Sequence, residues 1–195
     1  MAMDALEALD ASAERNLALV AQVGPEQWDS PTPCTAWNVR TLVGHLIVGR
    51  HVYCGILHGC PATELRSIMA RQSEAADDDP VGACEDAVRA LRAAFSAPGA
   101  LDRTVTHPTM GEMSGRRLLV QLVCDTVVHS WDLATAIGAD PGLDDRLVEF
   151  AYAFYTGPPF GDGALYNVGY FAAPTESLSP GASPLDRLIH LVGRG

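Results

Sequence analysis

The segment CDTVVHSWDL, residues 124–133, contains the side chains in this sequence that are best suited to chemistry. Asp125 and His129 stand four residues apart within an otherwise apolar run. Residues at this spacing lie about 6 Å apart on one face of a helix, so a carboxylate and an imidazole there can converge on one ion. Because an unpaired buried carboxylate is costly, Asp125 must pair with another group, bind a metal or take up a proton.

A second apolar stretch, TLVGHLIVGR, is interrupted by His45 in the same way. With Asp125 and His129 it would complete a set of three metal ligands that leaves at least one coordination position open. Three protein ligands and an open position are typical of catalytic rather than structural zinc sites. From the residues alone, a buried Asp–His hydrogen-bonded pair without a metal is an equal alternative.

Apolar residues recurring at intervals of three and four predict the helices that would hold these side chains. We expect helices at 4–22, 37–57, 80–97, 115–137 and 144–156. Asp79 and Ser114 are the predicted N-caps of the third and fourth of these helices. Two further segments are predicted less regularly: a helix ending in an acidic surface loop at 62–79, and a short β-like turn at 101–115.

This pattern predicts an all-α protein whose economical architecture is a four-helix bundle with a short β-like hairpin. We expect a single domain over residues 1–195, with a core at about 4–156 and an irregular tail at 157–195. The tail is rich in Gly, Pro and Ser, and we expect only one or two helical turns near its end.

The composition excludes several classes of function. The chain has 195 residues, with 13 Lys and Arg against 24 Asp and Glu, for a net charge of −11. Such a charge argues against nonspecific binding to nucleic acid or to an anionic membrane. No apolar run is long enough to span a bilayer, and the acidic N-terminus does not resemble a signal peptide. The five cysteines form no CxxC pair, so we expect reduced thiols in a cytoplasmic protein.

The remaining candidate residues are assigned to structural roles. We interpret Trp37 and Trp131 as core packing rather than substrate contacts. Asp132 is taken as a surface charge, the alternative being a partner that orients a ligand histidine. Cys34 is interpreted as structural, although a thiol near a helix N-terminus can be reactive. Cys124 points away from the Asp125 face. The histidines interpreted as surface or solvated side chains are His51, His58, His107 and His190.

Two motifs in order carry a family resemblance: TPCTAWNVRTLVGHL, and DTVVHSWDLATAIG some eighty residues later. Together they resemble the metal-binding domain of mycothiol-dependent maleylpyruvate isomerases, within the DinB-like superfamily. The likeness is greatest to small actinobacterial members known mainly as metal-binding proteins. It covers roughly residues 5–140, and SPLDRLIHLVGR resembles the usual C-terminus of that branch.

The resemblance implies a four-helix bundle with a divalent metal at one end of its core. The favoured ion is Zn²⁺, with Ni²⁺ or another divalent ion as alternatives, and the implied ligands are His45, Asp125 and His129. The isomerase has Glu where this chain has Asp125, which leaves the identity of the metal open. The isomerase also has a further C-terminal domain, whereas only about 55 residues follow Ile137 here, so we do not expect maleylpyruvate isomerisation itself.

Two functions fit the resemblance. The first is a metal-dependent enzyme, a transferase or isomerase, that uses a low-molecular-weight thiol such as mycothiol on a small electrophile. The alternative is a non-catalytic metal- or ligand-binding bundle that acts as a sensor or scavenger. A hydrolase using metal-bound water would need a general base that the sequence does not identify. The expected partners are the thiol and the electrophile, not nucleic acid or membrane, and a homodimer is left open.

Overall fold

The computed structural model describes residues 3–160, 166, 171–175 and 177–194. These residues form two compact units. One spans Asp4–Pro141, and the other contains Met3 and the described residues from Gly142 onward. This boundary differs from the expected core at 4–156, because the helix predicted at 144–156 packs with the C-terminal helix. Whether the two units act as one domain stays a prediction.

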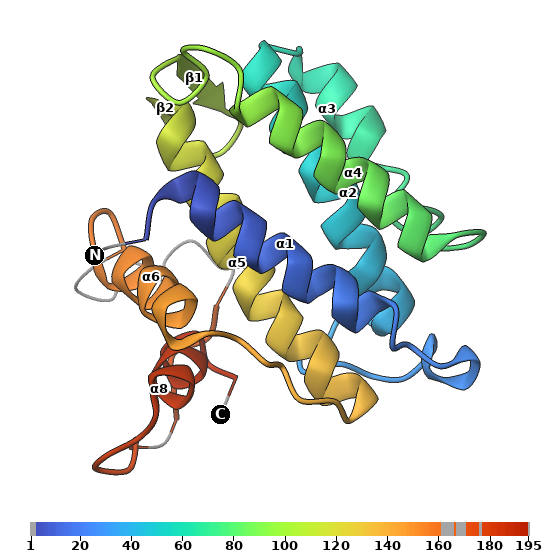
Figure 1. Cartoon of the computed structure of the whole chain (residues 1–195), viewed down its shortest axis with the longest axis vertical. Coiled ribbons are helices and arrows are strands. Elements are labelled where there is room, and N and C mark those ends of the chain that lie inside the picture. Colours follow the sequence, from blue (N-terminus) through green and yellow to red (C-terminus); the bar gives the residue numbers. More distant parts are fainter. Residues whose placement is uncertain (1–2, 161–165, 167–170, 176, 195) are drawn as a thin grey trace. The chain divides into compact units, whose positions relative to one another are not determined.

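The first unit is the predicted four-helix bundle (Figure 1). Its long helices are α1 (Ala5–Val20), α2 (Val39–His58), α4 (Pro80–Phe95) and α5 (Gly115–Ile137). Helices α1 and α2 each contact both α4 and α5. Every helix therefore has two neighbours, and a closed ring of four surrounds one core. The mainly helical structure confirms the all-α prediction.

Side-chain caps set the ends of these helices. Asp79 accepts the backbone N–H of Gly82 at the start of α4, and Ser114 accepts that of Arg117 at the start of α5, so both predicted N-caps are present. Helix α2 begins two residues later than expected. Asn38 caps it with a side-chain oxygen that accepts the N–H of Thr41, which ends the preceding loop one residue after Trp37. A capping side chain satisfies a helix donor that would otherwise lack a partner.

Short elements connect the long helices. They are η1 (Pro25–Gln27), α3 (Ala62–Met69), β1 (Thr104–His107) and β2 (Gly111–Ser114). The two strands pair antiparallel, with Thr104 opposite Ser114, so the β-like turn expected at 101–115 is a hairpin. Helix α5 starts close to the preceding turn at Ala100. A Cβ on Gly115 would lie only 2.0 Å from the carbonyl oxygen of Ala100, so this close approach requires glycine.

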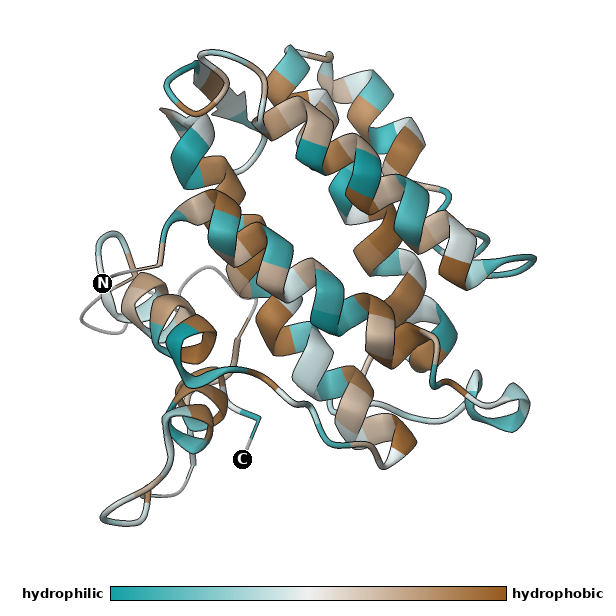
Figure 2. Ribbon diagram, viewed as in Figure 1, coloured by the Kyte–Doolittle hydropathy of each residue, from teal (hydrophilic) through white to brown (hydrophobic). Residues whose placement is uncertain are grey.

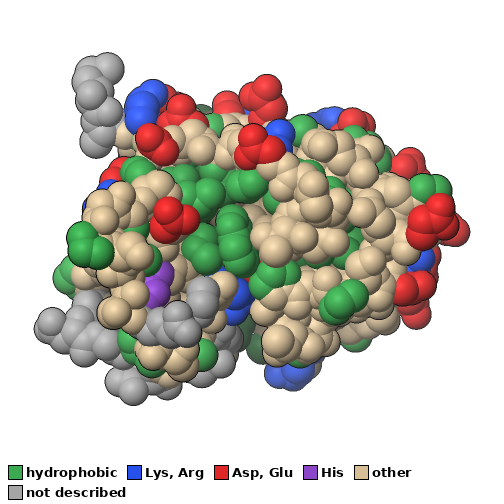
Figure 3. All heavy atoms as spheres, turned by 90° about the horizontal axis from the view of Figure 1, so that it is seen from below, with side chains coloured by type: hydrophobic (Ala, Val, Ile, Leu, Met, Phe, Trp, Pro, Cys, Tyr) green, Lys and Arg blue, Asp and Glu red, His purple; other side chains and the backbone are tan. Residues whose placement is uncertain are grey.

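The interior of the bundle is built mainly from leucine, valine and alanine. Hydrophobic and hydrophilic residues alternate along the helices in Figure 2. Helix α5 is buried on most of its circumference, as its nearly continuous apolar sequence predicts. Acidic side chains lie mainly along the edges of the surface seen in Figure 3, and the whole sequence has 24 Asp and Glu against 13 Lys and Arg. None of the described helices is long and apolar enough to cross a membrane.

The second unit contains α6 (Asp145–Thr156) and α8 (Pro184–Leu191). Ser183 and Asp186 form a capping box at the start of α8, and Arg187 of α8 pairs with Glu149 of α6. An aromatic cluster also lies in this unit, comprising Phe154, Tyr155, Phe160 and Phe171. Helix α8 supplies the helical turns that the sequence predicts near the end of the tail.

Candidate metal centre

His45 from α2 meets Asp125 and His129 from α5 inside the first unit. One potential ligand atom from each residue lies within 4.8 Å of the other two. His45 Nε2 is 3.4 Å from Asp125 Oδ2, and His129 Nε2 is 3.5 Å from Asp125 Oδ1. The tertiary structure therefore brings together the three residues that the sequence singled out, although they come from segments 80 residues apart.

The separations among these atoms suit a shared ion better than direct hydrogen bonds. An N–H···O hydrogen bond joins atoms about 2.9 Å apart, so 3.4 and 3.5 Å are long for a simple Asp–His pair. Two ligands about 2.05 Å from a tetrahedral zinc ion lie roughly 3.3 Å from each other. Neutral imidazole nitrogens and a carboxylate oxygen are also the donors that zinc accepts. The residues present therefore fit a divalent metal.

His129 is held in position by a buried carboxylate. Asp132 follows it by three residues on α5, and His129 Nδ1 lies 2.9 Å from Asp132 Oδ2. A carboxylate can only accept, so Nδ1–H donates and the lone pair is left on Nε2, the nitrogen that faces Asp125. Asp132 has 0% of its surface exposed. The interpretation of Asp132 as a surface charge is wrong, because the helix turns this position inward. Its spacing of three residues from His129 could have predicted that it orients this histidine.

Trp37 forms a wall of the same site. Its ring centroid lies 4.5 Å from that of His45 and 5.5 Å from that of His129. The loop before α2 fixes Trp37 in place, because the backbone N–H of Trp37 donates to the carbonyl of Cys34. The hydroxyl of Thr32 lies within hydrogen-bond distance of the carbonyls of both Cys34 and Trp37. Trp37 is half-buried and packs against the hydrophobic core, as expected, and it also contacts the rings of His45 and His129.

The backbone beside His45 is closely packed. A Cβ on Gly44 would lie 2.0 Å from the carbonyl oxygen of Gln72, in the loop after α3. Only a residue without a side chain allows this loop to approach α2 at that point. The contact restrains the turn of α2 that presents His45 to α5.

The three residues differ in their access to solvent. The exposed fractions of the side chains are 34% for Asp125, 20% for His45 and 8% for His129. The site is therefore open on the Asp125 side and closed behind His129. His45 Nδ1 is buried and has no hydrogen-bond partner among the described residues, in contrast to His129 Nδ1. His45 is thus positioned by packing against Trp37, and His129 by a charged hydrogen bond.

Three other histidines of the first unit lie outside this cluster. His51 and His58 are exposed on α2, as predicted. His107 differs from the expected solvated side chain. It is half-buried, and its Nδ1 accepts the backbone N–H groups of Thr109 and Met110, which closes the turn between β1 and β2. Burial lowers the pKa of His107, so its neutral, accepting form is favoured.

The cysteines supply no further ligand to the cluster. Cys124 is fully buried beside Asp125, and burial, with the nearby carboxylate as a smaller cause, raises the pKa of its thiol well above the ordinary value. Cys34 is half-buried, and its backbone carbonyl anchors the loop that carries Trp37. Trp131, on α5, is partly exposed and makes no ring contact with the site among the described residues.

A mainly helical bundle that brings His45, Asp125 and His129 together between α2 and α5 defines a helical-bundle protein with a candidate metal centre. The solved structure of a mycothiol-dependent maleylpyruvate isomerase has the same fold, with a TM-score of 0.62 and 13% sequence identity over 75% of this chain. A mutant of that enzyme gives a TM-score of 0.61 at 12% identity. The chain spans 65% of the length of these structures.

Residues 9–134 match the mycothiol maleylpyruvate isomerase N-terminal domain family. This chain belongs to that family. The uncharacterized protein Rv0738 of Mycobacterium tuberculosis is 31% identical over 145 residues, which is 74% of each chain. Another uncharacterized protein of that organism, Rv0036c, is 26% identical over 152 residues, or 69% of this chain and 57% of its own length. The matched region includes His45, Asp125 and His129.

Proposed function

We propose that this protein is a metal-dependent enzyme that uses a small thiol of the mycothiol type. It either transfers this thiol to a small electrophile or uses the thiol to isomerise that electrophile. The observation that carries the proposal is the convergence of His45, Asp125 and His129 to within 4.8 Å, with one side of the cluster open to solvent. Membership of a family named for a mycothiol-dependent isomerase supports the choice of thiol. The identities of the electrophile and of the native metal are further parts of the same proposal.

The three residues divide the work of holding the ion. His45 and His129 offer neutral nitrogens, and Asp125 offers the anionic oxygen from the solvent side. These residues would hold a divalent ion, which would favour the thiolate form of a bound thiol and so supply a nucleophile at neutral pH. We propose Zn²⁺ as this ion, because two imidazoles and one carboxylate leave a tetrahedral site one position short.

The residues around the ligands restrict where a substrate can bind. Trp37 covers the imidazole rings of His45 and His129 with an apolar face. Asp132 keeps the proton of His129 on Nδ1, which fixes the orientation of the imidazole ring and leaves the lone pair of Nε2 available to the metal. The thiol and the electrophile must then meet on the side of Asp125, where the side chains are most exposed.

The cysteines are compatible with work in a reducing cytoplasm. All five lie among the described residues, and no disulfide joins any two of them. We propose that the thiol in the reaction is an added small molecule rather than one of these cysteines, because none of them lies in the ligand cluster.

The first experiment measures metal and thiol binding together. Protein purified without an affinity tag is analysed for metal content, and the ion is then exchanged for cobalt. Adding mycothiol should produce a sulfur-to-cobalt charge-transfer band, with an apparent pKa of the bound thiol below the roughly 8.5 of a free thiol. A band together with turnover of an electrophile supports the enzyme. If mycothiol leaves the spectrum of the fully loaded protein unchanged, the thiol mechanism is wrong and a metal-organised binding bundle is the better account.

A further inference from the structure

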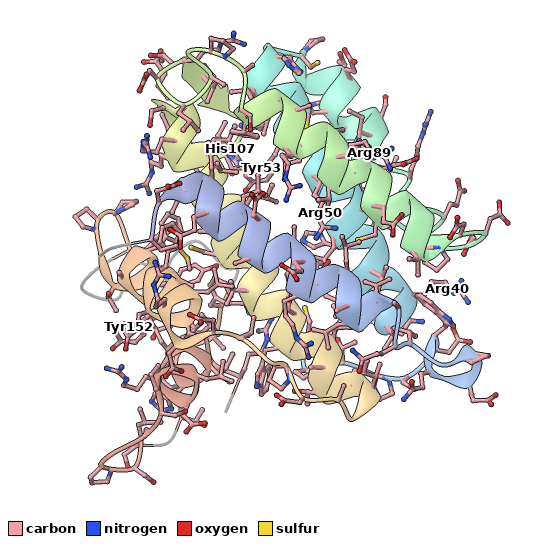
Figure 4. The ribbon with its side chains drawn as sticks, in the orientation of Figure 1. Arg40, Arg50, Tyr53, Arg89, His107 and Tyr152 are labelled. Carbon is pink, nitrogen blue, oxygen red and sulfur yellow. The ribbon has the colours of Figure 1, made fainter. Side chains whose placement is uncertain are left out.

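One arginine of the bundle is buried in its core. Arg50 lies on α2 and has 2% of its surface exposed. In Figure 4 it lies between the ribbons of α1 and α2, whereas Arg40 and Arg89 extend outward. A guanidinium stays charged in proteins, and moving a charge out of water is costly unless other groups compensate it. Arg50 therefore needs partners inside the bundle.

These partners form a polar cluster around Asn16 of α1. Asn16 Oδ1 accepts from Arg50 Nη2 at 2.7 Å and from the thiol of Cys84, on α4, at 3.7 Å. Asn16 Nδ2 donates to Ser130 Oγ of α5 at 3.3 Å. Arg50 Nη1 also donates to Cys84 Sγ at 2.9 Å. Asn16, Cys84 and Ser130 are each 0% exposed. Asn16 is thus joined to a side chain from each of the other three long helices.

The partners of Arg50 among the described residues are an amide and a thiol, not a carboxylate. The ion pairs of the described chain join other side chains, and the buried carboxylate of Asp132 accepts from His129. Neutral partners offset less of the desolvation cost than a carboxylate would. Even complete buried ion pairs can often be replaced by apolar residues without loss of stability. The stability of the bundle therefore does not account for a buried arginine.

What the polar cluster does supply is a fixed rotation of α5 about its own axis. Consecutive apolar residues occur along this helix at 118–120, 122–123 and 127–128. Neighbouring residues of a helix point about 100° apart, so these side chains face several sides of α5. Apolar contacts are not directional, and they hold α5 in the core without selecting one rotation. The hydrogen bond from Asn16 to Ser130 does select one, because it requires the Ser130 side of α5 to face α1.

We propose that Arg50 is a positioning residue for the metal centre, and that it acts through Asn16 and Ser130 to set the register of α2 against α5. Ser130 directly follows His129, and Arg50 comes five residues, or about 7.5 Å along the helix axis, after His45. The hydrogen bonds from Arg50 to Asn16 and from Asn16 to Ser130 therefore connect the two helices close to their ligand residues.

Such a connection matters because a metal site demands accurate placement of its ligands. Metal–ligand distances tolerate errors of about 0.2 Å, whereas a slip of one residue moves a helix by about 1.5 Å along its axis. The proposal rests on the metal centre of the proposed function, and it adds the residues that place the ligands His45 and His129.

The test measures zinc affinity, the cobalt absorption spectrum and apo-protein melting on the full-length chain. Arg50→Met keeps a long side chain but removes the charge and its hydrogen bonds. The apo-protein should melt no lower than the wild type, because the partners left behind are neutral. Zinc affinity should fall by about tenfold or more, and the bands of the fully cobalt-loaded protein should change with the ligand geometry. A residue that only stabilised the fold would instead lower the melting temperature and leave the spectrum of the loaded protein unchanged.

Two variants serve as controls. Asn16→Asp keeps an acceptor for Arg50 and gives it a carboxylate, so zinc affinity and the cobalt spectrum should stay close to those of the wild type. Leu57→Met changes another buried position of α2 with little change in volume, and it should also keep both. Loss of affinity in Leu57→Met equal to that in Arg50→Met would overturn the proposal, because any disturbance of the α2 core would then have the same effect.

Ser130→Ala covers the case in which Arg50→Met does not fold. It removes only the link to α5, and it should weaken zinc binding and change the cobalt spectrum. Wild-type affinity and spectrum in folded Arg50→Met, or in folded Ser130→Ala, would overturn the proposal and leave the metal centre intact. If the wild type itself bound no zinc, the metal centre would be refuted and this proposal with it.

Discussion

Replacing Asp132 by asparagine tests whether a buried carboxylate prepares His129 for metal binding. In the wild type, His129 Nδ1 lies 2.9 Å from Asp132 Oδ2. Asparagine has nearly the same shape as aspartate and can still accept the Nδ1–H of His129, but the negative charge is lost. The side chain is fully buried, so solvent does not screen that charge. Loss of such a partner weakens metal affinity about 10- to 100-fold, which corresponds to roughly 1.4–2.8 kcal/mol. We expect zinc binding to weaken by this amount.

The assay is a competition titration of apo-protein and zinc against a chromophoric chelator, with circular dichroism and apo-protein melting recorded in parallel. The matched control is Asp102→Asn, which removes an exposed carboxylate and should leave the affinity unchanged. Asp132→Glu keeps the charge and should recover part of the loss. Equal zinc affinities for folded Asp132→Asn and wild type would refute the reasoning, and His129 would then be oriented by packing alone.

Three further predictions concern other parts of the bundle. His45→Ala and His129→Ala should each abolish tight binding of one divalent ion per chain, and full occupancy by elemental analysis in both variants would remove these residues from the site. Gly44→Ala should lower the free energy of unfolding by about 1–3 kcal/mol, because its Cβ would meet a backbone carbonyl at 2.0 Å. Gly49→Ala, with nothing within 4 Å, should raise it by about 0.5–1 kcal/mol in denaturant titrations. Burial lowers the pKa of His107, so His107 takes up a proton at higher pH in the unfolded chain than in the folded one. The free energy of unfolding should therefore fall as the pH drops below about 6.5. His107→Asn should reduce this loss, and identical stability–pH profiles for the variant and the wild type would contradict the prediction.

The sequence predicted those features that depend on neighbouring residues along one helix. The apolar period and the caps Asp79 and Ser114 determine where α4 and α5 begin, because helix signals act over a single turn. Asp125 and His129 could be paired in advance for the same reason, since a four-residue spacing places both on one face. His45 is 80 residues away, and its place opposite them was inferred from its apolar surroundings and the family resemblance.

Tertiary structure decided the environment of each polar side chain. Asp132 was interpreted from the sequence as a surface charge, yet it is buried, and so is Arg50 of α2, because the ring of four helices covers the faces on which they lie. Trp37 stands before α2 and contacts His129 of α5 only because the loop folds back over the ligand end of the bundle. Local sequence fixes which way a side chain leaves its own helix, but its partner is set by the helix packed opposite, and that choice depends on the packing of the whole core.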